Sequence, residues 1–331
     1  MSYKVALLIP YYGNWPNDYF NLFLDSCKNN KLLDIHFITD QNINRTIDNV
    51  KSIYMSINTI ESLISDKLNI NICLNNPYKL CDFKPTYGVL FGDYIKDYKY
   101  WAYGDIDLIF GNISKFISEK ILLDNDIITF RTDHIHGPFT IIKNISSNNE
   151  LYKSGVNYKE ILKNDLYMSF DEFGSQGFKI NKDHPDENIL EDNFSAICYN
   201  AFRRNELSLY MEDFSIEKII DSKNVLIYNE GEIYDIETKK EYMFYHWVWE
   251  KRSLWFKYPT WIDNIPKRYY IADTGFYNES QYRFYFFISI KRKIVGTINW
   301  CFLKTINYIK RLIGKNVTID TYPRVGFVKY I

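Results

Sequence analysis

Short apolar runs alternate with stretches of helical periodicity in the first part of the chain. Residues 4–10 and 35–40 are two such runs, each of a length typical of a buried strand. Between them, apolar side chains recur every three or four residues, which predicts a helix over residues 17–30. Strand, helix and strand at this spacing indicate a βαβ unit, and a βαβ unit implies a parallel sheet.

The alternation continues farther along the chain. Pro85 suits the first turn of a helix, and Asn112 can cap another. The pattern predicts helices over residues 59–68, 85–97 and 113–121, and strands over residues 99–103, 126–131 and 242–249.

Two carboxylates follow the strand at residues 99–103. In an extended segment, residues i and i+2 point the same way, so Asp105 and Asp107 aim at one point while Ile106 points into the protein. Such a pair is costly unless a cation neutralises it, and the chain has no Lys or Arg between Lys99 and Lys115. Divalent ions prefer oxygen ligands and substrate phosphates, so the pair favours a metal-bridged nucleotide. The alternative, a solvated turn, fits poorly with the apolar and aromatic flanks.

Three polar features fall at the ends of predicted parallel strands. They are the aromatic loop at residues 11–16, Asp40, and the Asp105/Asp107 pair. In open α/β sheets, ligands bind outside the carboxyl ends of the strands, so these features should converge. A glycine-rich dinucleotide fingerprint and a phosphate-binding P-loop are both missing from the sequence.

Composition narrows the classes of partner. The chain has 331 residues and a net charge of −1, so a whole-protein basic field for nucleic acid is absent. Its five cysteines are scattered without a Cys-x-x-Cys pair, which indicates neither a zinc knuckle nor a disulfide framework and fits a reducing compartment. The sequence shows neither a signal-peptide pattern nor an 18-residue apolar run.

Taken in order, these motifs resemble a known family, the bacterial GT-A-fold glycosyltransferases with an Asp-x-Asp metal motif. The similarity is greatest to surface-polysaccharide transferases of the capsule and lipopolysaccharide type, and it covers residues 4–255. The residues that carry it are Tyr11 to Pro16, Trp101 to Gly111, Asp171 with Glu172, and His246 followed by Lys251.

The resemblance implies an α/β fold with a GT-A-like, Rossmann-like central sheet. This sheet would be mostly parallel, flanked by helices, and followed by a basic amphipathic helical extension. It implies a catalytic domain over residues 1–260. Residues 261–331 lie beyond the resemblance, and their own composition predicts an aromatic, basic extension for attachment to a membrane surface.

The resemblance also implies roles for single residues. The first loop and Asp40 would contact the base and ribose of a nucleotide-sugar donor, and Asp105, Asp107 and His246 would bind Mn2+ or Mg2+. The imidazole ligand favours Mn2+, although a core histidine is the alternative for His246. Lys251 would stabilise the departing diphosphate, but the glycine of the related His-x-x-Gly-x-x-Lys motif is absent. The implied donor-binding set is Pro10, Tyr11, Tyr12, Gly13, Asp40, Trp101, Tyr103, Gly104, Asp105 and Lys251.

Asp171 and Glu172 are candidates for work on the acceptor. A carboxylate there could take the proton from an attacking sugar hydroxyl. The alternative is a helix start, since Ser169 with Glu172 matches a capping box. His134 and His136 form a second pair that could line the acceptor cleft.

The end of the chain is basic and amphipathic. Between Arg283 and Lys315 there are Lys or Arg at residues 283, 291, 292, 293, 304, 310, 311 and 315, and no acids. Apolar residues recur every three or four positions, as in a helix that lies on an anionic membrane. The alternative is a helix packed on the core with its charges in solvent.

We therefore expect a cytoplasmic, metal-dependent glycosyltransferase, peripheral on the inner face of the cytoplasmic membrane. It would move a sugar from a nucleotide-diphosphate donor onto a glycan acceptor, expected to be lipid-linked, in bacterial surface-polysaccharide synthesis, with no nucleic-acid partner. One alternative is a sugar nucleotidyltransferase, which would normally carry a glycine-rich loop after the first strand. The others are a glycoside hydrolase, which needs no nucleotide, and a non-catalytic membrane-associated assembly protein.

Overall fold

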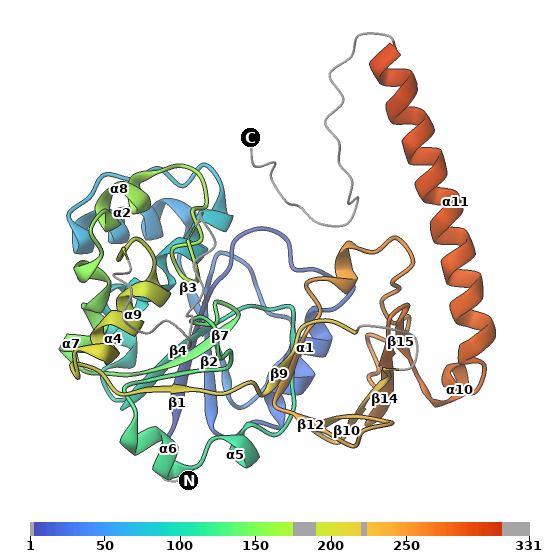
Figure 1. Ribbon diagram of the computed structural model, residues 1–331, viewed down its shortest axis with the longest axis horizontal. Coiled ribbons are helices and arrows are strands. Elements are labelled where there is room, and N and C mark those ends of the chain that lie inside the picture. The colour runs from blue at the N-terminus through green and yellow to red at the C-terminus, as the bar shows by residue number, and fades with distance from the viewer. Residues whose placement is uncertain (1–2, 175–189, 220–223, 313–331) are drawn as a thin grey trace. The chain divides into compact units, whose positions relative to one another are not determined.

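The computed structural model of the chain describes residues 3–174, 190–219 and 224–312 (Figure 1). The chain divides into two units. The first unit comprises Met1–Trp15, Asn30–Ile106 and Ile113–Ser215, and the second comprises Pro16–Asn29, Asp107–Asn112 and Ile216–Ile331. Each unit is therefore built from segments that are distant in sequence.

The first unit contains a mixed, mostly parallel seven-stranded sheet ordered β3-β2-β1-β4-β7-β6-β8. β1 pairs in parallel with β2 and β4, and β2 pairs in parallel with β3, which confirms the predicted parallel sheet. β7 runs antiparallel to both β4 and β6. The strands are β1 (Val5–Pro10), β2 (Leu33–Thr39), β3 (Val50–Tyr54), β4 (Tyr100–Gly104), β6 (Ile127–Thr129), β7 (Phe139–Lys143) and β8 (Leu209–Met211).

The central strands of this sheet are buried along most of their length. Val5 to Leu8 have no exposed surface, and neither do Trp101, Ala102 and Tyr103 in the neighbouring β4. Strands covered on both faces read as continuous apolar runs, which is why the sequence pattern located them. β4 ends at Gly104, so Asp105 follows the buried strand directly.

Helices of the first unit differ from the predictions mainly in how they begin and break. The helix predicted at 59–68 is α2, and it starts earlier because the Ser56 side chain accepts a hydrogen bond from the Thr59 amide. The helix predicted at 85–97 is instead three short elements, and the one predicted at 113–121 is two. The helices are α2 (Ile57–Leu68), η1 (Pro77–Thr86), α3 (Tyr87–Leu90), α4 (Gly92–Ile95), α5 (Ile113–Phe116), α6 (Glu119–Asp124), α7 (Ser146–Asn149), η2 (Leu151–Ser154), α8 (Tyr158–Lys163) and α9 (Phe194–Arg203).

The second unit contains a five-stranded sheet ordered β12-β11-β10-β14-β15, antiparallel throughout. In a separate sheet, β5 and β13 pair antiparallel, and α1 packs on β5 through a ring contact between Phe23 and Phe110. The strands are β5 (Leu108–Phe110), β10 (Leu226–Asn229), β11 (Glu232–Asp235), β12 (Glu241–Tyr242), β13 (Phe244–His246), β14 (Arg268–Ala272) and β15 (Gly275–Tyr277). The two-residue strand β9 (Ser215–Ile216) has its first residue in the first unit and its second residue in the second. The helices are α1 (Phe20–Lys28), η3 (Glu250–Arg252), α10 (Glu279–Tyr282) and α11 (Tyr285–Leu312).

A domain boundary at residue 260 stays a prediction. Two strands beyond that residue, β14 and β15, belong to the same sheet as β10. Among the described residues, no helix combines the length and the apolar character that crossing a bilayer would require.

Candidate active site

Asp105 is neutralised by Lys84, a residue that the sequence did not single out. The Lys84 ammonium lies 2.8 Å from Asp105 Oδ1 and 3.3 Å from Asp171 Oδ2, and it donates a hydrogen bond to the Gly137 carbonyl at 2.9 Å. The side chain is only 5% exposed. All four residues belong to the first unit, so a buried cation bridges two of its carboxylates.

The electrostatics of this bridge favour the charged form of Lys84. Burial alone would lower the pKa of the ammonium, but the carboxylates of Asp105 and Asp171 raise it well above its ordinary value. The cation that neutralises Asp105 therefore comes from outside the segment between Lys99 and Lys115, which has no Lys or Arg. Lys84 escaped notice because it precedes Asp105 by 21 residues. Its only sequence signal is a lone lysine between Phe83 and Pro85.

Asp171 is a buried carboxylic acid with a perturbed affinity for protons. Burial raises its pKa to about 6, against the lowering effect of Lys84. The Tyr167 hydroxyl donates a hydrogen bond to Asp171 Oδ1 at 2.9 Å. The preceding loop is fixed by Asp82, which accepts hydrogen bonds from the amides of Met168 and Phe170, both at 2.8 Å. Asp171 is thus positioned by the Tyr167 hydroxyl and the Lys84 ammonium, and it is shielded from solvent.

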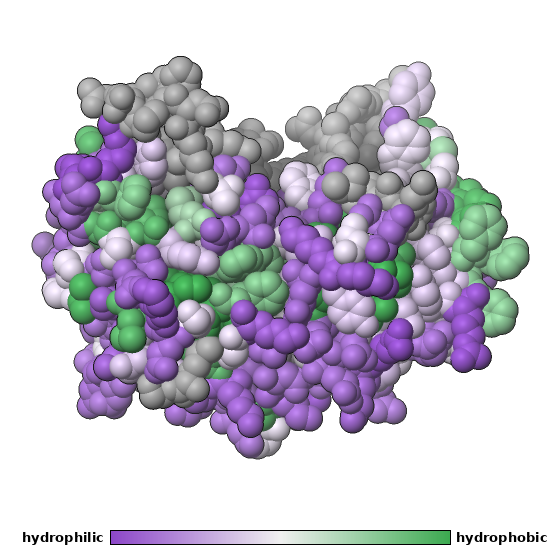
Figure 2. All heavy atoms as spheres, turned by 60° about the horizontal axis from the view of Figure 1, so that its bottom comes forward, coloured by the Kyte–Doolittle hydropathy of each residue, from purple (hydrophilic) through white to green (hydrophobic). Residues whose placement is uncertain are grey.

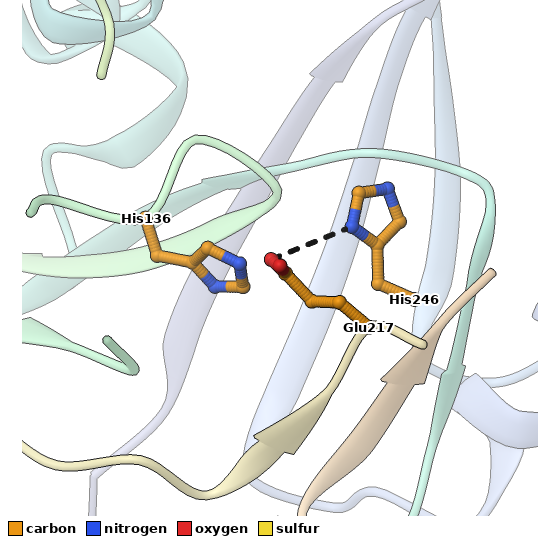
Figure 3. A group of neighbouring side chains, drawn as sticks. All are labelled: His136, Glu217 and His246. Atoms are coloured by element: carbon orange, nitrogen blue, oxygen red, sulfur yellow. Dashed lines mark ion pairs between the residues drawn. The ribbon is translucent and has the colours of Figure 1, made fainter. Parts of the chain in front are cut away.

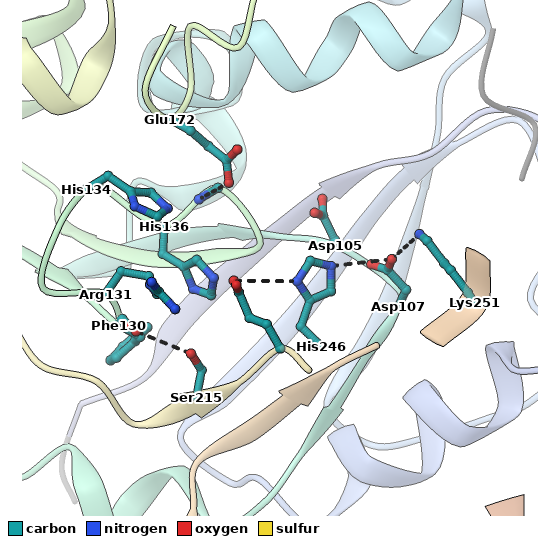
Figure 4. A network of polar contacts seen from close by, with 12 residues as sticks. Asp105, Asp107, Phe130, Arg131, His134, His136, Glu172, Ser215, His246 and Lys251 are labelled. Carbon is teal, nitrogen blue, oxygen red and sulfur yellow. Dashed lines mark hydrogen bonds and ion pairs between the residues drawn. The ribbon is translucent and has the colours of Figure 1, made fainter. Parts of the chain in front are cut away.

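Glu172 is engaged with the backbone of the same unit. Its Oε1 accepts a hydrogen bond from the Gly137 amide at 3.1 Å, as Figure 4 shows. A Cβ on Gly137 would lie 2.5 Å from that oxygen, so the contact requires glycine. Residues 171–174 form a turn, and no helix begins at Ser169 in the described part of the loop. The capping-box alternative is therefore not what the structure shows.

Asp107, in the second unit, lies between an ammonium and an imidazole. Its Oδ2 pairs with the Lys251 ammonium and lies 3.4 Å from His246 Nε2 (Figure 4). Burial would raise the pKa of Asp107, but the charges of Lys251 and His246 hold it well below its usual range. Asp107 is therefore ionised at neutral pH.

The pairing of β5 with β13 explains how His246 reaches Asp107. His246 lies opposite Leu108, the residue that follows Asp107. The other ring nitrogen of His246 is near a second carboxylate, since Nδ1 lies 3.9 Å from Glu217 Oε1 (Figure 3). His246 is therefore placed between two carboxylates, which distinguishes it from a core histidine surrounded by apolar side chains.

Lys251 is positioned by the short helix η3. Its backbone amide donates to the Trp247 carbonyl at 3.0 Å, and the neighbouring Glu250 accepts a hydrogen bond from the Ile219 amide at 2.6 Å. The glycine missing from the motif that the sequence resembles therefore does not prevent Lys251 from reaching Asp107.

The donor set suits a divalent ion. Asp107 and His246 direct a carboxylate oxygen and an imidazole nitrogen toward each other, and Asp105 precedes Asp107 by two residues. Carboxylate oxygens with one imidazole are ligands that Mn2+ and Mg2+ accept, the imidazole suiting Mn2+ better. An ion at this Asp-x-Asp pair would compete with Lys84 and Lys251 for the carboxylates.

The first loop and Asp40 also lie where the sequence predicted them, after β1 and β2. Tyr11 stacks on Trp15 with the ring centroids 4.6 Å apart, and Gly13 adopts φ +110°, which favours glycine. Tyr12 is buried, and burial together with Asp40 raises the pKa of its hydroxyl. Donor contacts by this loop, Pro10 and Asp40 stay predictions.

Trp101 and Tyr103 are core residues of the first unit. Neither has exposed surface, and the Trp101 indole donates to Asn149 Oδ1 at 2.7 Å. A Cβ on Gly104 would lie 3.0 Å from Leu7, so close packing against β1 explains this glycine. Any contribution of the two aromatic side chains to donor binding would act through the strand that carries Asp105.

The two other candidate histidines have different surroundings. His134 Nδ1 lies 2.9 Å from Asp133 Oδ1, and its ring meets that of Phe173 edge-on. His136 is fully buried, and its backbone amide donates to Thr129 at 2.8 Å. Their predicted place in an acceptor cleft stays a prediction.

The sequence matches one family over most of its length, residues 7–280. That family is described as a family of unknown function, DUF6625. The chain belongs to DUF6625. Lys84, Asp105, Asp107, Asp171, His246 and Lys251 all lie inside the DUF6625 region, whereas α11 lies entirely outside it. No curated protein matches the sequence.

Solved structures similar to the DUF6625 chain include several glycosyltransferases. Mouse xyloside xylosyltransferase 1 in its apo form has 12% identity and a TM-score of 0.37, with 66% of this chain and 88% of that chain covered. The galactosyltransferase LgtC in complex with donor and acceptor sugar analogs has 12% identity and a TM-score of 0.31, with 64% and 76% covered. The glycosyltransferase GlyE of Streptococcus pneumoniae TIGR4 has 13% identity and a TM-score of 0.31, with 63% and 45% covered.

Proposed function

We propose that this DUF6625 protein is a metal-dependent glycosyltransferase that uses a nucleotide-diphosphate sugar. The observation that carries the proposal is the state of Asp107, a buried and ionised carboxylate between His246 and Lys251, two residues after a second acid. Two acids two residues apart can bind a divalent cation together, and the Lys251 ammonium can pair with a further anion.

Cleavage of a nucleotide sugar at its anomeric carbon leaves negative charge on the diphosphate. A divalent ion held by Asp105, Asp107 and His246 would stabilise that charge. Lys251 would then give up Asp107 to the ion and direct its ammonium to the diphosphate. Lys251 is near enough to exchange partners in this way because it already contacts the carboxylate.

Lys84, Asp105 and Asp171 support binding of the sugar. Charged groups that are paired and buried keep a fixed geometry, which suits hydrogen bonds to sugar hydroxyls. Between the two acceptor-side candidates, we assign the general base to Asp171. Its pKa of about 6 is closer to neutral pH than that of an ordinary carboxylate, and Glu172 already accepts a backbone hydrogen bond. The acceptor is proposed to be a growing surface glycan.

Calorimetry with uridine diphosphate, with and without Mn2+, tests the proposal. We expect binding that depends on the metal and that is weakened at least about ten-fold by Asp107→Asn, since loss of a charged ligand costs a metal site heavily. Asp93→Asn is the matched control, because Asp93 is 88% exposed and pairs with Lys67 at the surface.

The proposal fails if Mn2+ has no effect on nucleotide binding, or if both substitutions weaken binding equally. A thermal-shift screen of nucleotide sugars with Mn2+ then identifies the donor, because a ligand that binds the folded state raises the melting temperature. Turnover of a nucleoside triphosphate and a sugar phosphate in place of a nucleotide sugar would instead indicate a nucleotidyltransferase.

A further inference from the structure

The helix α11 contacts its own unit partly through basic residues, and it leaves several large apolar side chains exposed. Arg292 donates to the Thr274 carbonyl at 3.0 Å and stacks on Tyr277, with 4.2 Å from the guanidinium to the ring centroid. Lys293 pairs with Asp273 at 2.8 Å, and Gly296 lies against Trp255. Tyr285 and Ile288 at the start of the helix add apolar contacts with the same unit, so the contact face of α11 combines charged, small and apolar residues.

Large apolar side chains occupy the opposite face. At about 100° per residue, Ile294 points about 200° away from Arg292. Six side chains on this outward side are between 42% and 71% exposed, and we call them the α11 stripe: Phe287, Ile290, Ile294, Ile298, Phe302 and Ile309. The stripe extends over about 33 Å at 1.5 Å per residue. Hydrophobic surface appears at the right-hand edge of Figure 2, the side on which Figure 1 draws α10 and α11.

The exposed apolar stripe of α11 differs from the usual arrangement of a surface helix. A surface helix of a soluble domain normally buries its apolar stripe and exposes its charges. The alternative in which α11 packs on the core with its charges in solvent fits Lys293, which is 44% exposed, but not Arg292, which contacts the Thr274 carbonyl and the Tyr277 ring. An exposed apolar surface of this extent marks a place where something binds.

The positive charge of α11 indicates which partner could cover the α11 stripe. Residues 283–312 contain Lys or Arg at positions 283, 291, 292, 293, 304, 310 and 311 and no acid. A second copy of α11 would bring the same positive charges face to face, which is unfavourable. Residues 313–331 carry three basic residues and one acid, so their sequence offers no complementary charge either.

We propose that the α11 stripe lies in the interface of an anionic lipid bilayer, with the helix in the plane of the membrane. The stripe would enter the boundary between head groups and acyl chains, and the exposed Lys291 and Lys304 would contact anionic head groups. Trp300 and Tyr308, 46% and 64% exposed, are the aromatic residues that favour this boundary. The cytoplasmic leaflet supplies such lipids. This inference does not depend on the proposed chemistry.

Flotation of the full-length protein with vesicles tests it. We expect binding to vesicles that contain phosphatidylglycerol and not to pure phosphatidylcholine vesicles. The triple variant Phe287→Ser, Ile294→Ser, Ile298→Ser should bind at least about ten-fold more weakly, because it removes three inserted side chains. These residues are exposed, so the variant should fold, and its circular dichroism and melting temperature should match those of the parent protein.

Two further variants test the contribution of the lysine charges and whether the apolar side chains must lie on α11. Lys291→Gln with Lys304→Gln should weaken binding by about five-fold per charge and reduce its salt dependence. The control Tyr54→Ser with Val156→Ser removes apolar side chains that are 77% and 65% exposed but lie outside α11, and it should bind as the parent does.

Several results would overturn the proposal. One is equal vesicle binding by the parent and the triple variant, and another is binding to neutral and anionic vesicles alike. Dimerisation that the triple variant abolishes, without vesicle binding, would assign the stripe to a second copy. A gel-shift with nucleic acid, again without vesicle binding, would assign it to a polyanion.

Discussion

Lys84 and Lys251 each neutralise one member of the Asp-x-Asp pair, Lys84 within the first unit and Lys251 within the second. Buried ions of this kind contribute little net stability as pairs, but loss of one partner leaves an uncompensated charge. The two lysines therefore hold the carboxylates in place until a ligand takes over. The consequences can be measured one residue at a time.

Lys84→Met should lower the free energy of unfolding by about 3 kcal/mol, because Asp105 and Asp171 would lose their shared cation. Urea denaturation measures the change. The control Lys153→Met removes a lysine whose partner Glu150 is 49% exposed, and it should alter stability by less than about 0.5 kcal/mol. A loss below about 1 kcal/mol for Lys84→Met would show that the bridge is not needed.

Asp171 should make the stability of the protein depend on mild acidity. Its pKa is raised from 3.8 to about 6 on folding, so the folded state holds this proton more tightly than the unfolded state. The resulting stabilisation is complete below the lower value and is lost as the pH rises through about 6. In Asp171→Asn, this part of the decline between pH 4 and pH 6 should disappear from urea titrations. An unchanged pH profile would contradict the assignment.

At the scale of elements, the pairing of β5 with β13 places the residues of the second unit that surround Asp107. Gly111 follows β5 and has no room for a side chain, since a Cβ would lie 2.7 Å from the Tyr242 carbonyl oxygen and 3.3 Å from that of Met243. Backbone atoms cannot move aside as a flexible side chain does. The position therefore controls the register that brings His246 beside Asp107.

Gly111→Ala should destabilise the protein by about 2 kcal/mol, as other overpacked sites do. It should also weaken Mn2+-dependent nucleotide binding through the displaced His246. Gly92→Ala is the control, because a Cβ there meets nothing within 4 Å and alanine favours the helix. Thermal melts and calorimetry report both effects, and equal behaviour of the two variants would rule out a role for the register.

The sequence predicted elements well where burial alone decides them. β1, β2 and β4 are continuous apolar runs, and each lies within a residue or two of its predicted position. The helix predicted at 85–97 breaks because tertiary packing overrides periodicity. Gly88, for example, lies against Asn149 and Trp101 so closely that a Cβ would be 2.5 Å from the Asn149 oxygen.

The residues of the candidate site also fall into two groups, those that the sequence predicted and those that only the fold reveals. Asp105 and Asp107 were found because both acids are adjacent to one strand, and His246 and Lys251 because their order resembles a known motif. Lys84 and the environment of Asp171 were not found, since their contacts join η1 with distant loops. A contact of this kind leaves no periodicity in the chain, so only the fold reveals it.

At the scale of the whole molecule, neither unit is a continuous stretch of sequence. Expression of residues 1–215 alone should therefore fail to give a folded protein. It would retain α1 and β5 but lose β13, leaving Phe23, Ile109 and Phe110 without the partners that bury them. Solubility and circular dichroism test this expectation. A version that ends at residue 282 is the control, since it keeps β13, and it should remain folded.

The orientation of α11 also exposes the thiol of Cys301, which can carry a reporter dye. Cys301 is exposed and follows Ile294 by seven residues and Ile298 by three, so it lies on the outward side of the helix. Cys27 and Cys198 are buried, which leaves Cys73 as the other fully accessible thiol in the described chain. After Cys73→Ser, an environment-sensitive maleimide dye should attach mainly at Cys301. Its emission would then report, in real time, whether that side of the helix meets water or lipid.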